Sequence, residues 1–397
     1  LNLFEEASSV PVMLSMLVLC LDTLLPTTRL PTSRLDLYKT SVRAAISRRF
    51  ANESDPAGAA HAAGCLLAKL CVANHLAQRR EFTSVDVAKV FADAPEELAL
   101  FQRFEGEAGG VPLLKILEVG EHSTTNADQA SKYQMAHLSF QESFFAEALC
   151  AAEADASSAT SSGLVNADIA SNAKTTWSRG ALRALNDRWL LNSFAICGKL
   201  LGPTVAEHLG SRMTELRFTQ HQVKALIALE WEPLRCCRQP INKLFIPCGK
   251  DSDFTSMSSP GAKKLAQLLS DKNELTSLTS IEFGMPKSME APVAARISSA
   301  VAQRRSLRLF DTLQCAQFGD LTDADAVLIA STLRSCAQLS DEALIRDVCT
   351  ARLAKAGGGS KAVINLTGGE TSGGGDTNER TLAEALKQGG IQLSSMA

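Results

Sequence analysis

The chain has 397 residues, a formal net charge of −3, 21% charged residues and 5% aromatic residues. A single hydrophobic core stops growing near ~250 residues, so this length predicts more than one structural unit. The composition, in which leucine and alanine prevail, is typical of a helix-rich globular chain. Since Lys and Arg are not in excess, the overall charge argues against a protein whose main partner is nucleic acid.

Eleven cysteines occur without any C-x-x-C pair, and several stand among apolar neighbours, as Cys71 and Cys197 do. An odd number of thiols in such settings favours a reducing, cytoplasmic compartment over a disulfide framework. Because the chain opens with Leu1 inside an expected helix, we expect it to be part of a longer protein.

The most apolar stretch runs from Val10 to Leu25 and contains a proline and an aspartate. A helix that crosses a bilayer needs about 20 residues, more than this stretch provides. No basic segment precedes it, which argues against a signal peptide. We therefore expect a buried helix and no membrane span.

Two capped helices come next. After a proline-punctuated turn, Ser33 to Asp36 has the form of a capping box, and apolar residues recur at helical spacing as far as Arg49. Asp55 and Pro56 supply an N-cap and a first-turn proline for a second helix that reaches Leu76. We expect the two helices to be antiparallel neighbours.

Shorter elements follow and end in a hairpin. They are a helix capped at 84–87 that ends near Phe91, a helix from Pro95 toward Phe104, a break at 105–110, and two β-leaning runs, 111–119 and 132–138. A polar loop of residues 120–131 joins the two runs. Helices followed by a hairpin that abuts one more helix is the order of a winged-helix domain.

The middle of the chain predicts a small helical bundle. Residues 151–162 are a loop or a frayed helix end, and apolar residues recur at helical spacing from Trp177 to Phe194 and from Val205 to Leu216.

From Ile241 onward the pattern changes to short strands that alternate with helices. Apolar pairs recur at intervals of 29, 27, 27 and 27 residues, namely Ile281/Phe283, Phe310/Thr312, Ala337/Leu339, Ile364/Leu366 and Ile391/Leu393. A strand-plus-helix unit of about 28 residues cannot bury its own apolar face, so such units must stack.

In each unit, the residue between the two strand positions is expected on the concave face of the stack. These candidate partner-binding residues are Glu282, Asp311, Gln338, Asn365 and Gln392. Repeat proteins bind partners on this face, but a polar surface is also what solubility requires, so both interpretations stay open.

Several motifs resemble those of NACHT-type STAND NTPases, the NOD-like receptor group. Residues 137–142 read H-L-S-F-Q-E and are followed by Phe144-Phe145-Ala146, as in the winged-helix domain of that family. Residues 11–17 resemble the family's P-hydrophobic-L-S-M-L helix, and residues 35–38 resemble its L-Y helix start. The units near Ile281 and Phe310 resemble leucine-rich repeats of the ribonuclease-inhibitor kind.

The resemblance implies a nucleotide switch. It places His137 at the β-phosphate of ADP and Pro11 near the adenine. The ADP itself would be held by a nucleotide-binding module outside this chain. A histidine at a helix start can offer a ring N–H to a diphosphate. ADP or ATP would bind through that module, and this chain alone would bind neither tightly.

The chain also departs from the family pattern. Ser143 stands where an aromatic residue is usual, and the repeats lack the expected asparagine at Pro286 and Gly369. No G-x-x-x-x-G-K-[ST] motif occurs, because residues 357–362 read G-G-G-S-K-A, with serine and lysine in the wrong order. The segment therefore has no catalytic motif, although the longer protein could be an ATPase.

The expected fold is mainly α with an α/β repeat region. Its parts are the end of a NACHT-associated helical domain (1–30), a winged-helix domain (31–155), a helical linker domain (156–239) and a leucine-rich-repeat solenoid (240–397). The expected function is the regulatory part of an ATP/ADP-switched cytoplasmic scaffold that oligomerises on activation and binds protein partners through its repeats.

Two other functions stay open. One is a leucine-rich-repeat interaction module without nucleotide switching. The other is a winged-helix nucleic-acid binder that uses the basic side chains of residues 34–49, although a solvated helix face explains those charges as well. No Cys/His cluster has zinc spacing, and we assign no metal.

Overall fold

The computed structural model describes residues 10–24, 31–120, 129–151, 164–209, 215–237, 240–247, 260–271, 274–278 and 280–284. The chain divides into two compact units after His208. The described residues are mainly helical, as the composition predicts, and form two small sheets.

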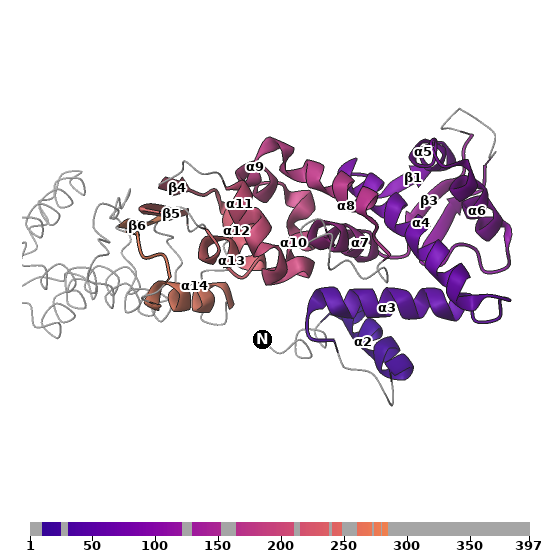
Figure 1. Ribbon diagram of the computed structural model, residues 1–397, viewed down its shortest axis with the longest axis horizontal. Coiled ribbons are helices and arrows are strands. Elements are labelled where there is room, and N and C mark those ends of the chain that lie inside the picture. The colour runs from indigo at the N-terminus through magenta and orange to yellow at the C-terminus, as the bar shows by residue number, and fades with distance from the viewer. Residues whose placement is uncertain are drawn as a thin grey trace, which may run out of the picture. The chain divides into compact units, whose positions relative to one another are not determined.

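The first unit begins with α2 (Pro11–Leu24), which packs against α3 (Arg34–Arg49) (Figure 1). Ser33 caps α3, because its hydroxyl oxygen accepts a hydrogen bond from the Asp36 backbone N–H at 3.1 Å. The Asp36 carboxylate in turn accepts from the Thr32 hydroxyl at 3.0 Å. The predicted cap of α3 is therefore confirmed.

Helix α2 is buried along one face. The buried residues are Met13, Met16, Leu17 and Cys20, whereas Leu14 and Val18 are 43% and 58% exposed. The prediction of a helix within Val10–Leu25 is confirmed. The expectation that it is buried holds for only one of its faces.

Helix α4 (Pro56–Leu76) starts as the sequence predicts and packs against α3. The Asp55 carboxylate accepts from the Gly58 backbone N–H at 3.0 Å, and the proline lies in the first turn, where its missing N–H costs nothing. Among the described residues, α4 is the one helix long and apolar enough to cross a membrane. Because many side chains of α4 lie in the core of the first unit, its length and apolar composition fit a core helix equally well.

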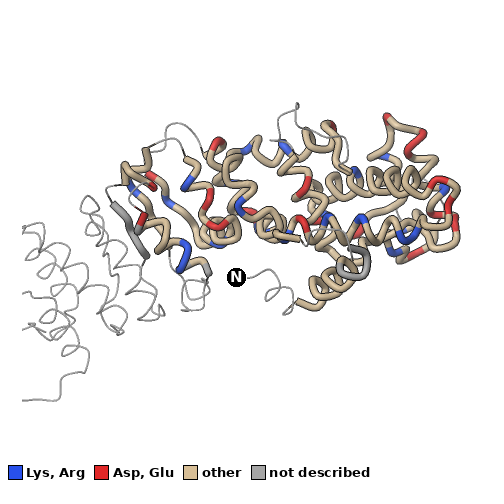
Figure 2. Tube along the Cα trace, turned by 60° about the horizontal axis from the view of Figure 1, so that its bottom comes forward, with Lys and Arg blue, Asp and Glu red and all other residues tan. Residues whose placement is uncertain are grey.

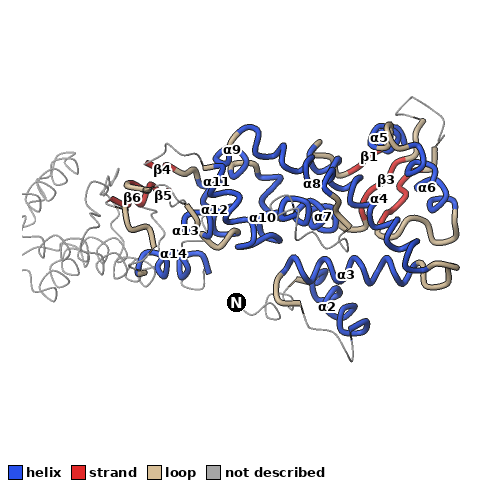
Figure 3. The backbone as a smooth tube through the Cα atoms, viewed as in Figure 1, coloured by secondary structure: helices blue, strands red, loops and turns tan. Residues whose placement is uncertain are grey.

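A small antiparallel sheet follows α4 (Figures 1 and 3). The elements are β1 (Glu81–Thr83), α5 (Ser84–Val90), α6 (Pro95–Gly106), β2 (Leu114–Glu118) and β3 (Lys132–Met135). Strand β3 is central, so the order is β1-β3-β2. The rings of the register partners Phe82 and Tyr133 lie 5.7 Å apart and anchor the sheet in the core.

The predicted hairpin of β2 and β3 is confirmed, as are the two short helices before it. Strand β1 was not predicted from the sequence. The cap of α5 lies at Thr83, one residue earlier than expected, and forms a capping box with Asp86.

Helix α7 (Leu138–Ala151) runs through the middle of the first unit and packs against α3 and α4. Short helical segments complete the unit, as the sequence predicts for this region. They are α8 (Ala167–Lys174), η1 (Thr175–Arg179), α9 (Ala181–Leu185), η2 (Arg188–Leu190), α10 (Leu191–Cys197), η3 (Gly198–Leu201) and α11 (Gly202–His208). Helix α10 packs closely on α7.

The described part of the second unit is a parallel sheet with helices between its strands. Its elements are β4 (Glu215–Arg217), α12 (Gln220–Ala228), α13 (Glu232–Arg235), β5 (Lys243–Pro247), α14 (Pro260–Ser270) and β6 (Ser280–Gly284). The strand order is β4-β5-β6. The buried Trp231 indole N–H donates to the Gly261 carbonyl at 3.1 Å and ties the start of α13 to α14.

The helical interpretation of residues 205–216 is wrong at its end. Leu216 is the buried centre of β4, and α11 ends at His208. The alternation of strands and helices therefore begins at β4, earlier in the chain than Ile241, the predicted start. The predicted units from residue 285 onward lie outside the described residues.

Candidate functional site

The best-defined candidate site is the junction between β3 and α7, where the H-L-S-F-Q-E motif lies. Strand β3 ends at Met135, and the Ala136 backbone N–H donates to the Leu113 carbonyl at 2.7 Å, which fixes the entry into the helix. Helix α7 is buried along most of its length, from Ser139 to Leu149. His137, immediately before the helix, is exposed.

The imidazole of His137 caps α7. Its Nδ1 accepts a hydrogen bond from the Ser139 backbone N–H at 3.2 Å, and the Ser139 hydroxyl oxygen lies 2.6 Å from the same nitrogen. Unpaired N–H groups in the first turn give a helix start a partial positive charge. The first turn of α7 contains no acidic residue that would offset this charge. The junction therefore suits an anion.

Polar contacts hold α7 in place. Buried Tyr38 of α3 lies beside the Ser139 side chain, which lowers the pKa of Tyr38 against the larger effect of burial. The Glu142 carboxylate accepts a hydrogen bond from the Asn192 amide of α10, and burial raises the pKa of Glu142 despite that bond. The Lys39 ammonium lies 3.0 Å from the Glu147 carboxylate. Helix α7 is thus tied to both α3 and α10.

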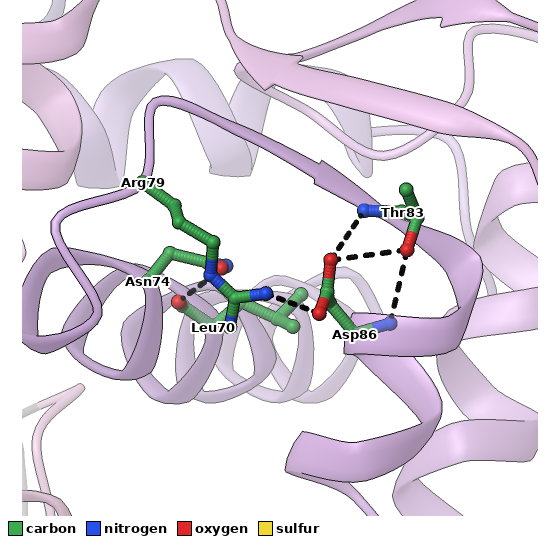
Figure 4. Close-up of polar contacts among 5 residues, drawn as sticks. All are labelled: Leu70, Asn74, Arg79, Thr83 and Asp86. Atoms are coloured by element: carbon green, nitrogen blue, oxygen red, sulfur yellow. Dashed lines mark hydrogen bonds and ion pairs between the residues drawn. The ribbon is translucent and has the colours of Figure 1, made fainter. Parts of the chain in front are cut away.

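A second set of contacts joins α7 to the turn between α4 and β1. The Gln141 side-chain amide donates to the Arg79 carbonyl at 2.9 Å. Arg79 forms an ion pair with Asp86, whose carboxylate also accepts from the Thr83 backbone N–H at 3.0 Å, as Figure 4 shows. The Asn74 amide donates to its own helix at Leu70 at 2.9 Å. The motif glutamine therefore connects α7 to the capping box of α5.

Tyr38 and Ser139 lie within the motifs, but no role was predicted for either residue. Ser139 holds the imidazole that caps α7, and Tyr38 lies beside Ser139. The signal was present in the L-D-L-Y and H-L-S-F-Q-E patterns, which contain both residues. Nothing local in either pattern indicates that the two side chains meet.

Pro11, the other predicted nucleotide contact, is exposed and begins α2. Its carbonyl accepts from the Ser15 hydroxyl at 3.0 Å, which is an ordinary contact within a helix. Helix α3 packs against both α2, which Pro11 begins, and α7, which His137 immediately precedes.

Of the five predicted partner-binding residues, Glu282 lies on β6, level with Phe245 of β5. Asp311, Gln338, Asn365 and Gln392 lie outside the described residues. The neighbouring strands place further charges on the sheet: Lys243 of β5 lies 2.9 Å from the Glu215 carboxylate of β4.

Helix α3 has five basic residues and one acidic residue, and Figure 2 shows basic and acidic residues interspersed over the described chain. Two of the basic residues of α3 form ion pairs within the unit. Lys39 binds Glu147, and Arg49 lies 3.6 Å from Glu107 and also donates to the Gly110 carbonyl at 3.3 Å. These contacts favour a structural role for part of the basic set.

The cysteines and His75 among the described residues show no second candidate site. No three His, Cys, Asp or Glu side chains among them come together to hold a metal ion. The described cysteines are free thiols, and Cys71 and Cys197 are buried as the sequence predicts. Buried His75 lies 3.1 Å from the Ser193 hydroxyl and is surrounded by aromatic rings.

Comparison with known proteins gives no family assignment. No protein-family model matches the sequence, and no curated protein matches it. Function must therefore be argued from the residues of the chain itself.

Proposed function

We propose that this chain is the regulatory part of a nucleotide-switched signalling scaffold of the NACHT type. In this proposal residues 31–155 are a winged-helix domain that closes onto a separate nucleotide-binding module. ADP in that module keeps the protein closed, and replacement by ATP opens it. The full-length protein acts in the cytoplasm and oligomerises after opening.

The order of elements supports a winged-helix domain. Helix α4 leads into β1, two helices follow, and the β2–β3 hairpin closes a sheet of order β1-β3-β2. A helical core with a hairpin at the edge of a small antiparallel sheet is what the resemblance implies for residues 31–155. Helix α7, which carries the motif, then follows the hairpin directly.

The observation that carries the proposal is the exposed imidazole of His137 in front of the buried helix α7. A core helix ordinarily begins with a capping residue such as Ser, Thr, Asp or Asn. Here the cap is a histidine that is exposed, at a helix end that attracts anions. The ring and the helix start together favour a contact with the diphosphate of ADP.

The second unit supports an additional role in protein interaction. Parallel strands β4, β5 and β6 alternate with helices, as the strand-plus-helix units of a leucine-rich-repeat solenoid do. In this proposal the repeats bind protein partners or restrain the closed state. In the alternative function, a repeat module without nucleotide switching, the repeats would still bind partners, and this binding would not depend on His137.

The test is the nucleotide content of the full-length gene product. After purification in buffer without nucleotide, the protein is denatured and released nucleotides are separated by chromatography. We expect close to one ADP per wild-type molecule and a clear loss in His137→Ala. His61→Ala is the matched control, because it removes another exposed histidine. A full-length product that carries no nucleotide-binding module, or equal ADP in all three proteins, would refute the proposal.

A further inference from the structure

Residues behind the imidazole of His137 determine which of its two nitrogens can reach a ligand. Both hydrogen bonds that the described residues give the ring are at Nδ1. One comes from the Ser139 backbone N–H, which can only donate. In this geometry Nδ1 is therefore an acceptor and carries no proton, so the proton of the neutral ring is on Nε2.

The Ser139 hydroxyl strengthens this arrangement. Its oxygen lies 2.6 Å from Nδ1, a distance at which the hydroxyl must donate, because an unprotonated nitrogen offers only a lone pair. With its own proton used in this way, the hydroxyl oxygen has lone pairs left to accept another hydrogen bond.

Tyr38 lies beside Ser139. Its side chain is buried, and burial raises the pKa of its phenol, whereas the Ser139 side chain lowers it. The two hydrogen bonds at Nδ1, both from Ser139, therefore carry the positioning of the ring.

We propose that Ser139 is a positioning residue that fixes His137 in the Nε2-protonated tautomer, so that Nε2–H is the donor left for a phosphate-type anion. Ser139 itself does not touch the anion. The inference rests on the proposed function for the identity of the ligand, but the tautomer is a property of the chain as it stands.

The tautomer can be measured directly. Full-length chain labelled with ¹⁵N at histidine is examined by long-range ¹H–¹⁵N correlation spectroscopy above about pH 8, where an ordinary imidazole is neutral. The His137 signal is assigned as the one that His137→Gln removes. We expect an unprotonated Nδ1 and a protonated Nε2. A protonated Nδ1 in the wild-type protein would overturn the proposal without any further variant.

Variants test the positioning residue. In Ser139→Ala we expect the His137 nitrogens to shift toward the average of a tautomer mixture, and in Ser139→Thr, which keeps the hydroxyl, we expect the wild-type pattern. Wild-type nitrogen shifts in Ser139→Ala would refute the role of the Ser139 hydroxyl.

Failure of this inference and failure of the proposed function give different results. If the tautomer is as expected but His137→Ala retains ADP in the full-length gene product, the nucleotide contact is wrong and the positioning stands. If His137→Ala loses ADP but Ser139→Ala changes neither the spectrum nor ADP retention, the contact stands and the positioning is wrong. With both correct, Ser139→Ala should weaken ADP retention roughly two- to tenfold, the loss expected for one hydrogen bond.

Discussion

His75 provides a sharp test of the packing of the first unit, because it is a titratable group in an apolar core. Its side chain is only 1% exposed, and its ring lies 4.4 Å from that of Phe145 and 5.3 Å from that of Trp189. Nε2 lies 3.1 Å from the Ser193 hydroxyl, and Nδ1 has no hydrogen-bond partner among the described residues. Burial lowers the pKa of His75 to about 3.

The sign and size of the effect follow from linkage. An unfolded chain binds a proton at this residue near pH 6.5, whereas the folded protein binds it only near pH 3, so acid favours unfolding. The stability that the neutral His75 provides is fully present above about pH 6.5. Below that pH, the free energy of unfolding falls by at most ~1.4 kcal/mol per pH unit because of this residue. Between pH 7.5 and pH 5.0, His75 alone should lower the free energy of unfolding by about 2 kcal/mol.

Urea unfolding followed by tryptophan fluorescence measures this difference, since Trp189 contacts the His75 ring. His75→Gln removes the titration and keeps a polar end that can reach Ser193. The variant is expected to be less stable at pH 7.5, but its free energy of unfolding should fall about 2 kcal/mol less than that of the wild type on moving to pH 5.0. His61→Gln, at an exposed position, should leave the pH dependence unchanged. Equal pH dependence in His75→Gln and the wild type would show that His75 is not buried as described.

Two further predictions concern the same unit. Gly64→Ala should lower the free energy of unfolding by about 1–2 kcal/mol in a urea titration, because its new Cβ would lie 2.5 Å from a Leu164 methyl carbon, whereas Gly106→Ala, which has open space, should not be destabilising. If the two alanine variants are equally stable, the packing against Leu164 is wrong. Asp86→Ala should cost about 1–2 kcal/mol through loss of the α5 cap, and Asp86→Asn should cost less because it keeps an acceptor oxygen. Burial alone would raise the pKa of Asp86, but hydrogen bonds from Thr83 and the ion pair outweigh it and lower the pKa, so the stability that Asp86 provides should be lost as pH falls below about 4. An Asp86→Ala protein that keeps the wild-type loss of stability in this pH range would contradict that assignment.

The sequence predicts the elements that are specified locally. Ser33 and Asp55 mark helix starts because a cap needs only a side-chain oxygen and the backbone N–H groups of the first turn. The β2–β3 hairpin was likewise visible as two β-leaning runs joined by a polar loop. These predictions hold because neighbours in sequence are also the interacting partners.

Two short strands had no comparable signal. In β1, Phe82 is the one buried residue, and its pairing with Tyr133 joins positions far apart in the chain. In β4, Leu216 continued a helical spacing, and only its pairing with Leu244 of β5 makes it a strand. A three-residue strand is stabilised by its partner strand, and a pattern within one segment cannot reveal that partner.

The candidate site was predicted only in part, because some of its contacts join residues that are far apart in the sequence. The motif drew attention to His137, and the structure places that residue at an exposed helix start. The contact of Tyr38 with Ser139, and the burial of His75 against Phe145 and Trp189, depend on side chains from separate helices. Such tertiary contacts leave no periodicity in the sequence.

The most direct test of the account is the rate at which ADP leaves the full-length gene product. A fluorescent ADP analogue is bound and then displaced by excess unlabelled ADP, and the decay is compared between wild type, His137→Ala and His61→Ala. A hydrogen bond to a charged group contributes about 1.5–3 kcal/mol, so His137→Ala should release the analogue about 10- to 100-fold faster, and His61→Ala at the wild-type rate. Equal rates for His137→Ala and the wild type would contradict a contact between this histidine and the nucleotide.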